Sequence, residues 1–176
     1  MATIFLIGTS HRFQVANSAI VAAHTEAFRV LVRGCAISES VSGIGEEISL
    51  AEVQNRDATE SVCEEVANAL SITHCYCDPN EDERSALGIE QENAILARAL
   101  ISRPRGTTQE EARKHAAPLI AASHAKREAE WLRRLKAVGL ERVLFVCGAN
   151  HVDSFRYLLE RNGYVACVLE HDWEPT

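Results

Sequence analysis

Short apolar runs, separated by longer segments with helical spacing, dominate the pattern of hydrophobic and polar positions along the chain. The clearest runs are "TIFLIG" at 3–8, "RVLFVC" at 142–147 and "YVACVL" at 164–169. Continuous runs of this length, rich in β-branched and aromatic residues, are typical of strands buried on both faces. Weaker strands are indicated at 40–47 and at 71–78, where "SITHCYCD" alternates and leads into Asp-Pro.

Helical patterns fill the intervals between these runs. Apolar positions recur at helical spacing over 16–33, and Gly34 is expected to end that helix. A polar helix is expected over about 50–70, with Thr59 or Ser61 as a break or cap inside it.

The stretch from 85 to about 137 is also expected to be mainly helical. "RPRG" at 103–106 interrupts it, and "TTQE" then offers a capping box with Thr107 as N-cap and Glu110 three residues later. Pro118 is expected to kink or split the helix that follows.

Strand-like and helical segments also alternate at the end of the chain. Gly139 is expected to end one helix and Gly163 to cap another at about 152–162. Strands separated by helices imply parallel pairing, with helices on both faces of the sheet. We therefore predict a three-layer α/β sandwich. A single domain, 1–176, would hold a mainly parallel sheet of about five strands flanked by helices.

Composition narrows the classes of partner. The chain is 47% hydrophobic and 24% charged, and its 25 acidic against 18 basic residues give a formal charge of −7. No basic stripe is present, so nucleic acid is not expected as a partner. No apolar stretch approaches the roughly 20 residues of a membrane span, and the N-terminal segment lacks the features of a signal peptide.

Cysteine usage indicates a reduced compartment. The six cysteines include no Cys-x-x-Cys pair and no zinc-type spacing, so we expect a cytoplasmic protein. Cys147 and Cys167 lie within strand-like runs, where cysteine acts as a small hydrophobe.

Two of the predicted strands end in the same motif, Gly-x-x-His. These are "GTSH" at 8–11 and "GANH" at 148–151. In open parallel sheets, ligands bind outside the carboxyl ends of the strands. A single such histidine is usually a cap or a hydrogen-bonded residue. If the two strands are neighbours, however, His11 and His151 would face one another across one pocket.

Carboxylates follow other predicted strands. Glu46 and Glu47 close the second strand, and Asp78 closes the third. Adjacent side chains of a strand point to opposite faces, so one of the two glutamates reaches the crevice. The alternative for the glutamates is a solvated helix N-terminus, and for Asp78 a turn before Pro79.

An arginine lies on or beside the apolar stripe of the long helix. Arg127 is four residues before Trp131 and eight before Leu135. It is expected to find an anionic or carbonyl partner, or else to extend to solvent.

The same segments carry a family resemblance. "LIGTSH", "KREAEWLRRLK" and "VLFVCGANHVDSFRYLLERNGYVACVL" resemble the TraB/Tiki, ChaN and erythromycin esterase superfamily, most specifically over the last fifty residues. The resemblance implies an α/β fold with two Gly-x-x-His motifs and a site built from both histidines, a glutamate and an assisting arginine. Carried over, these are His11, Glu46 or Glu47, Arg127 and His151. Some members are metal-dependent peptidases, whereas others activate water with histidine and glutamate alone.

Two functions are consistent with these residues. The first is a hydrolase for a small-molecule or peptide substrate, of the ester or peptide class. Water would be activated by a divalent metal (Mn²⁺, Co²⁺ or Zn²⁺) or by a histidine polarised by a glutamate. The candidate metal ligands are His11, Glu46, His151 and Asp78, and the candidate catalytic residues are His11, Glu46, Glu47, Arg127 and His151.

The second is a non-catalytic binding or sensor module for a small ligand, a metal or haem. A serine nucleophile is not expected, because no Gly-x-Ser-x-Gly elbow is present, and "GTSH" is no phosphate-binding loop. Exposed Leu and Val in the 16–33 helix permit a homo-oligomer.

Overall fold

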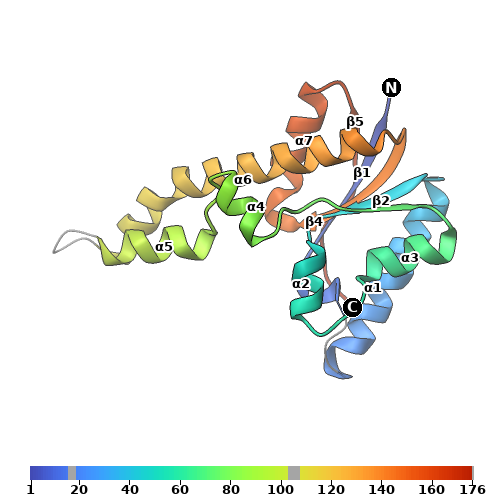
Figure 1. Ribbon diagram of the computed structural model, residues 1–176, viewed down its shortest axis with the longest axis horizontal. Helices are drawn as coiled ribbons and strands as arrows, with labels where there is room; N and C mark the ends of the chain where they lie inside the picture. The colour runs from blue at the N-terminus through green and yellow to red at the C-terminus, as the bar shows by residue number, and fades with distance from the viewer. Residues whose placement is uncertain (16–18, 103–107, 176) are drawn as a thin grey trace.

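A five-stranded parallel sheet forms the centre of the molecule (Figure 1). The computed structural model describes residues 1–15, 19–102 and 108–175. The strands lie in the order β3-β2-β4-β1-β5 and all neighbours are parallel. This confirms the predicted α/β class and the number of strands. The strands are β1 (Thr3–Thr9), β2 (Gly43–Glu46), β3 (Thr73–Tyr76), β4 (Arg142–Gly148) and β5 (Val165–Trp173).

The two strands that end in Gly-x-x-His are neighbours. β1 pairs with β4 along its whole length, with Gly8 opposite Cys147 and Thr9 opposite Gly148. Both strands are buried almost throughout, which explains their continuous apolar sequences. Their carboxyl ends therefore leave the sheet side by side, and the two motifs emerge at one edge.

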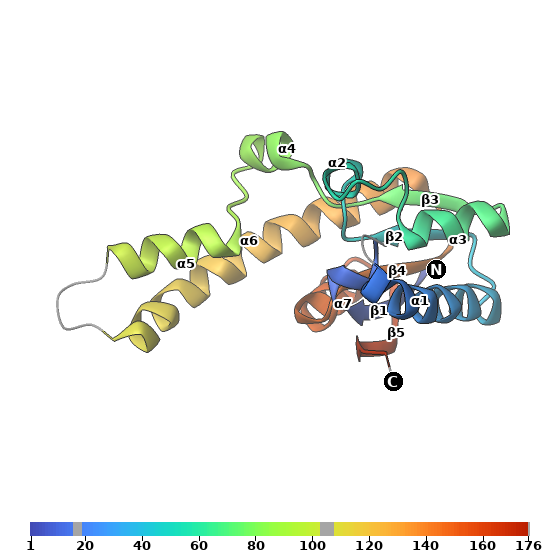
Figure 2. The same ribbon diagram turned by 90° about the horizontal axis from the view of Figure 1, so that it is seen from below.

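Helices cover both faces of the sheet. α1 (Ala19–Ser38) and α3 (Val62–Leu70) lie on one face, and α6 (Gln109–Val138) and α7 (Val152–Arg161) lie on the other (Figures 1 and 2). Each face has its own apolar core, which makes the three-layer arrangement. The first contains Phe5, Ile7, Phe28, Val32, Ala36, Ile44, Val66, Leu144 and Val146; the second contains Ile4, Leu6, Trp131, Leu132, Leu135, Phe145, Phe155 and Leu159.

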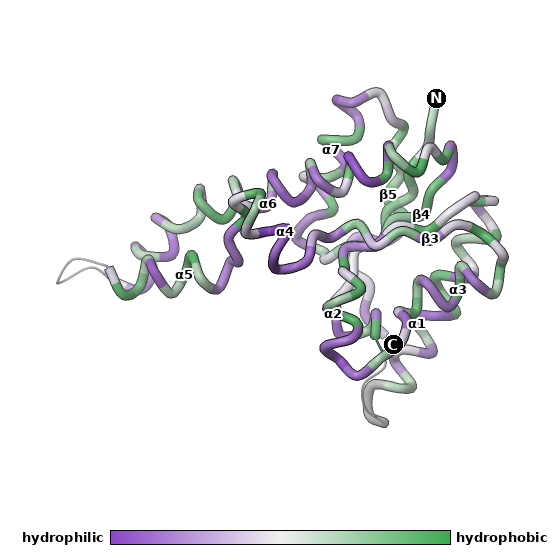
Figure 3. Tube along the Cα trace, in the orientation of Figure 1, coloured by the Kyte–Doolittle hydropathy of each residue, from purple (hydrophilic) through white to green (hydrophobic). Residues whose placement is uncertain are grey.

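A helical arm extends beyond the sheet. It consists of α5 (Glu92–Ile101) and the N-terminal half of α6, which run side by side away from the strands (Figure 2). α2 (Leu50–Asn55) lies at the carboxyl edge of the sheet, and α4 (Glu81–Ala86) connects β3 to the arm. Hydrophobic residues concentrate in the strands and in the helix faces against them, whereas polar residues intersperse the arm (Figure 3). Within the described ranges, no helix combines the length and the apolar character needed to cross a bilayer.

Several predicted boundaries are wrong, each for a local reason. α1 passes through Gly34 and ends at Ser38, because its buried apolar stripe continues from Val32 to Ala36. The break or cap expected at Thr59 or Ser61 within 50–70 is observed, however: the stretch forms two helices, and Ser61 caps the second by accepting a hydrogen bond from the backbone N–H of Glu64.

The capping box at the start of the long helix α6 lies one residue later than predicted. Thr108 and Glu111 cap each other's backbone reciprocally, whereas the predicted cap Thr107 and the interruption at 103–106 lie outside the described residues. Pro118 does not split the helix, which continues to Val138, and Gly139 ends it as predicted. The strands predicted at 40–47, 71–78 and 164–169 are observed at Gly43–Glu46, Thr73–Tyr76 and Val165–Trp173.

Candidate active site

The two Gly-x-x-His motifs bring their imidazoles to one carboxylate. His11 opens a short 3₁₀ helix directly after β1, and His151 closes another directly before α7. The Nε2 atoms of His11 and His151 lie 3.6 Å and 3.5 Å from the same atom, Oε1 of Glu47. The His11 side chain is 42% exposed, whereas that of His151 is 6% exposed. His11 thus lies at the rim of the site and His151 at its floor.

The glycines of the motifs permit this approach. A Cβ atom on Gly148 would lie 3.3 Å from Nε2 of His11 and 3.4 Å from Oε2 of Glu47. A Cβ atom on Gly8 would lie 1.9 Å from the carbonyl oxygen of His171, where β5 crosses closely. Gly148 therefore makes room for the site, and Gly8 makes room for a neighbouring strand.

Glu47, and not Glu46, is the glutamate at the site. The Glu47 side chain is fully buried and its Oε2 accepts a hydrogen bond of 2.8 Å from the backbone N–H of Gly148. Glu46 points to the opposite face of the sheet, where it contacts Nε2 of His74 at 2.7 Å and accepts from Ser61. The alternation of side chains along the strand separates the two glutamates, so the structure does not bring Glu46 together with the imidazoles.

Arg127 reaches the same carboxylate and is held from behind by Asp78. Its Nη2 lies 2.9 Å from Oε1 of Glu47, while Nε and Nη2 donate to Oδ1 of Asp78 at 3.0 Å and 2.9 Å. Trp131 Nε1 donates to this Oδ1 as well, and Arg84 donates to Oδ2. Asp78 therefore positions the guanidinium and does not face the imidazoles. Burial lowers the pKa of Arg127, but Glu47 and Asp78 more than compensate and raise it, so the guanidinium is always charged.

Glu128, which the sequence patterns did not single out, fixes the orientation of His151. Its buried Oε1 lies 2.8 Å from Nδ1 of His151 and accepts a second hydrogen bond of 2.6 Å from Ser154 Oγ. Because a carboxylate can only accept, Nδ1 carries a proton. The Nε2 atom of His151 is thereby directed at Glu47. His11 is arranged in the same way, with Nδ1 3.2 Å from Oε1 of Gln14.

Two aromatic rings enclose His151. The His124 ring lies 4.3 Å from it, centroid to centroid, and the Trp131 ring packs edge-on at 4.9 Å. His124, Arg127, Glu128 and Trp131 recur at intervals of three and four residues along α6, which puts them on one face of the helix. That spacing was the available signal for His124 and Glu128.

The charges of the site are strongly coupled. Burial alone would raise the pKa of Glu47, but His11, His151 and Arg127 outweigh it and lower the pKa to about 2. Burial alone would lower the pKa of His11, but Glu47 and Gln14 outweigh it and raise the pKa above its ordinary value. Burial, together with the charge of His151, lowers the pKa of His124. Glu47 is therefore a carboxylate at neutral pH, and His124 is neutral.

The site opens into a cavity of about 770 Å³. Its floor is the carboxyl edge of β1, β2 and β4, and its walls come from α2, from α6 and from the segment that leads into the arm. This volume lies within the usual range for small-molecule sites. The lining includes His11, Glu47, Glu52, Arg56, Asp78, Glu90, Glu92, His124, Arg127, Gly148 and His151.

The predicted metal ligands are His11, Glu46, His151 and Asp78. The structure brings the two histidines together but places neither Glu46 nor Asp78 with a carboxylate oxygen free to join them. Glu46 lies on the other face of the sheet, and both oxygens of Asp78 already accept hydrogen bonds from side chains.

The remaining donor set fits a divalent cation poorly. Two imidazole nitrogens and one carboxylate oxygen are chemically suited to Mn²⁺, Co²⁺ or Zn²⁺. However, the guanidinium of Arg127 lies 2.9 Å from the Glu47 oxygen that such an ion would need, and its charge opposes a second cation there. In the part of the chain that the structure describes, no three His, Cys, Asp or Glu side chains form a group that could hold a metal ion.

Comparisons of the chain with protein-family models, curated proteins and solved structures give no match. The resemblance to the TraB/Tiki, ChaN and erythromycin esterase superfamily stays a prediction based on the quoted motifs.

Proposed function

We propose that this protein is a hydrolase in which His11 activates a water molecule against the carbonyl carbon of an ester or amide. The observation that carries the proposal is the convergence of two imidazole Nε2 atoms on Oε1 of Glu47. This oxygen is buried, and no donor among the described residues meets it with hydrogen-bond geometry. A water molecule, with two protons to donate, complements such a group of acceptors.

The chemistry assigns a role to each group. Nε2 of His11 accepts a proton from the water, and the resulting hydroxide oxygen attacks the carbonyl carbon. The imidazolium of His11 then returns the proton to the leaving group. Ionised Glu47 stabilises this imidazolium, and His151, oriented by Glu128, keeps the water in line for attack.

Arg127 supplies the positive charge for the oxyanion. Nε and Nη2 both donate to Asp78, and Nη2 also forms an ion pair with Glu47. The third nitrogen, Nη1, has no hydrogen bond to any residue that the structure describes, so it is left for the oxygen of the tetrahedral intermediate. Charge stabilisation of this kind is typically the largest contribution of a hydrolytic site.

The mechanism uses no metal, in keeping with the charge of Arg127 beside Glu47. We therefore expect hydrolysis to persist after dialysis against a chelator and to gain less than about twofold from added Mn²⁺, Co²⁺ or Zn²⁺. The test is a panel of ester, amide and phosphoester reporters, assayed with chelator and with each metal. Turnover only in the presence of metal would contradict this part of the proposal. Binding of reporters that depends on both histidines, without turnover of any of them, would favour a sensor module instead.

The dependence of kcat/KM on pH should follow the deprotonation of His11. Its Nε2 acts as a base only when unprotonated, and the pKa of His11 is raised above 6.5. We expect kcat/KM to rise with pH and to level off above that value. Removing the charge that raises the pKa, by Glu47→Gln, should move the acid limb of any residual activity to lower pH. A limb that stays in place would argue that another group titrates.

Gly148→Ala should reduce activity more than stability. Its Cβ would press on Nε2 of His11 at 3.3 Å, and a displaced general base loses on the order of tenfold or more in kcat/KM. Gly34→Ala is the matched control, since a Cβ there meets nothing within 4 Å and helix propensity predicts about 1 kcal/mol of stabilisation. Equal activity of the two variants would show that Gly148 is not needed for the approach of His11.

A further inference from the structure

Two cysteine thiols meet at the end of β3, outside the residues of the proposed hydrolytic mechanism. Cys75 lies in β3 and Cys77 follows the strand, and residues two apart in extended chain share a face. The Sγ atoms are 3.5 Å apart, and the Cys77 thiol lies within donating distance of both the Cys75 sulfur and, at 3.6 Å, the Cys75 carbonyl oxygen. Both side chains pack against the core beneath α6.

The two thiols differ in exposure and in acidity. Cys75 is partly exposed, whereas Cys77 is fully buried. The hydrogen bond from Cys77, supported by the charges of His74 and Arg134, outweighs burial and lowers the pKa of Cys75 to about 7. The same hydrogen bond, together with burial, raises the pKa of Cys77. Cys75 is therefore the more acidic thiol of the pair, beside a neighbour that keeps its proton.

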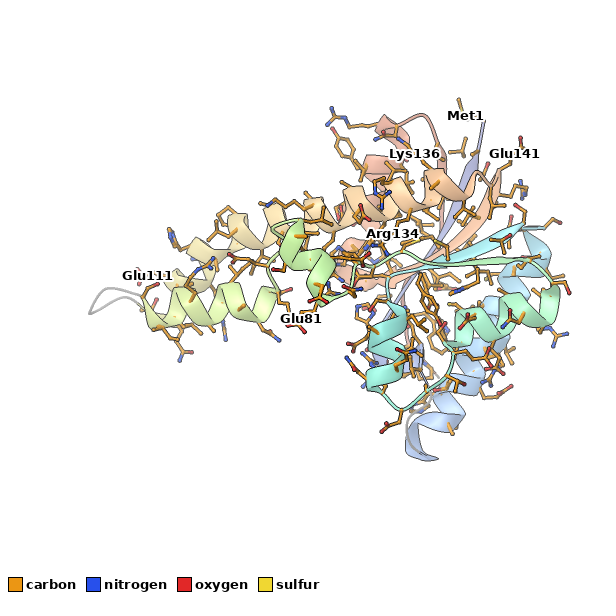
Figure 4. All side chains as sticks on the ribbon, in the orientation of Figure 1. Met1, Glu81, Glu111, Arg134, Lys136 and Glu141 are labelled. Carbon is orange, nitrogen blue, oxygen red and sulfur yellow. The ribbon has the colours of Figure 1, made fainter. Side chains whose placement is uncertain are left out.

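Arg134 holds its positive charge near this pair. It belongs to α6, where Figure 4 labels it, and its Nη2 donates to Glu83 of α4 at 2.8 Å. Its Nη1 reaches the carbonyl oxygen of Tyr76, the residue between the two cysteines, at 3.5 Å. A partly exposed thiolate, a nearby cation and an adjacent second thiol together are typical of cysteines that respond to oxidants.

We propose that Cys75 and Cys77 form a peroxide-sensitive pair, in which Cys75 is attacked first and Cys77 resolves the product as a disulfide. The Cys75 thiolate attacks the hydrogen-bearing oxygen of a hydroperoxide. The O–O bond breaks, and the other oxygen leaves as hydroxide or alkoxide and takes a proton to become water or an alcohol. Cys75 is then a sulfenic acid. The Cys77 sulfur attacks the Cys75 sulfur, the S–O bond breaks, and water leaves with the proton of Cys77. The two thiols lose two electrons and the peroxide gains them.

The pair lies beside a residue that lines the candidate active site. Closing the bond brings sulfurs that are 3.5 Å apart to about 2.05 Å, so the end of β3 must shift. β3 lies at the edge of the sheet, where β2 is its one partner among the described strands, which permits such a shift. Asp78 follows Cys77 directly and holds Arg127 and Trp131.

The test uses the reduced full-length protein and hydrogen peroxide, with mass analysis of the peptide that contains both cysteines. We expect that peptide to lose two hydrogens and to regain them with dithiothreitol. Cys35 is an internal reference, because burial raises its pKa. Its lower thiolate fraction, partly offset by its greater intrinsic nucleophilicity, should make it react at least about fivefold more slowly than Cys75.

Three single variants complete the experiment. Cys77→Ser should stop the reaction at a Cys75 sulfenic acid that dimedone traps, and Cys75→Ser should abolish the fast reaction. Cys35→Ser should leave the disulfide unchanged. The proposal is overturned if wild-type Cys75 proceeds to sulfinic acid with no disulfide, or if Cys35 reacts as fast as Cys75. Neither readout depends on hydrolytic activity.

Discussion

His11→Ala should lower kcat/KM for an ester reporter by about 1,000-fold, because a positioned general base typically contributes between about 10²- and 10⁴-fold. Its side chain is 42% exposed, but it is one of the groups that lower the pKa of Glu47, so the free energy of unfolding at neutral pH should fall by about 1–2 kcal/mol and the variant should stay folded. The measurement is steady-state hydrolysis together with denaturant unfolding of the same preparations. His115→Ala, an exposed histidine on the arm, is the matched control and should retain activity within about twofold.

His151 is better tested by a substitution that keeps its hydrogen bond to Glu128. His151→Ala would leave the buried carboxylate of Glu128 without its 2.8 Å partner, which is expected to destabilise the fold by about 1–3 kcal/mol. His151→Asn offers an amide N–H in place of Nδ1–H but has no Nε2. We expect this variant to fold and to lose at least about 100-fold in kcat/KM. Hydrolysis near the wild-type rate in a folded variant of either histidine would exclude a shared site.

Glu47→Gln should remove a large part of the acid-sensitive stability. The folded-state pKa of Glu47 is about 2, against an ordinary value of 4.5. A depressed pKa stabilises the fold fully above the unfolded-state value and loses that contribution as the pH falls through the folded-state value. The shift corresponds to a contribution on the order of 3 kcal/mol at neutral pH.

Denaturant titrations from pH 7 to pH 2 measure this contribution directly. The wild type should exceed Glu47→Gln in unfolding free energy at neutral pH, and the difference should shrink progressively between about pH 4.5 and pH 2. A difference that stays constant across this range would show that Glu47 is not held as a carboxylate by its neighbours. For activity, the adjacent Glu46→Gln is the control, since its side chain lies on the opposite face and hydrolysis should persist.

The strands and the pairing of the motifs were predictable because each depends on a local rule. "TIFLIG" and "RVLFVC" are apolar without alternation, as strands covered on both faces must be. Helix ends were less predictable. A glycine at position 34 stops a helix only when the apolar stripe also stops, and here Ala36 extends it. "TTQEE" contains two overlapping capping boxes one residue apart, and local sequence does not distinguish them.

At the candidate site, the sequence predicts which kinds of residue take part better than it predicts which side chains contact one another. Strand alternation allowed one of Glu46 and Glu47 to face the histidines, but the choice depends on where β2 ends within the sheet. Asp78 was expected beside the imidazoles; its two oxygens are instead occupied by Arg84, Arg127 and Trp131. Glu128 lies among other charged residues of α6. The sequence of the helix alone does not distinguish this buried carboxylate from the solvated ones, because its burial depends on His151, which follows a distant strand.

The unbroken course of α6 ties distant parts of the molecule together mechanically. At 1.5 Å per residue, about 27 Å of helix separates its first residue, Gln109, from Arg127. A tilt of about 10° at the base would therefore swing the far end by about 5 Å. Since Arg127, Glu128 and Trp131 belong to the same helix, such a tilt would also displace the guanidinium beside the histidines.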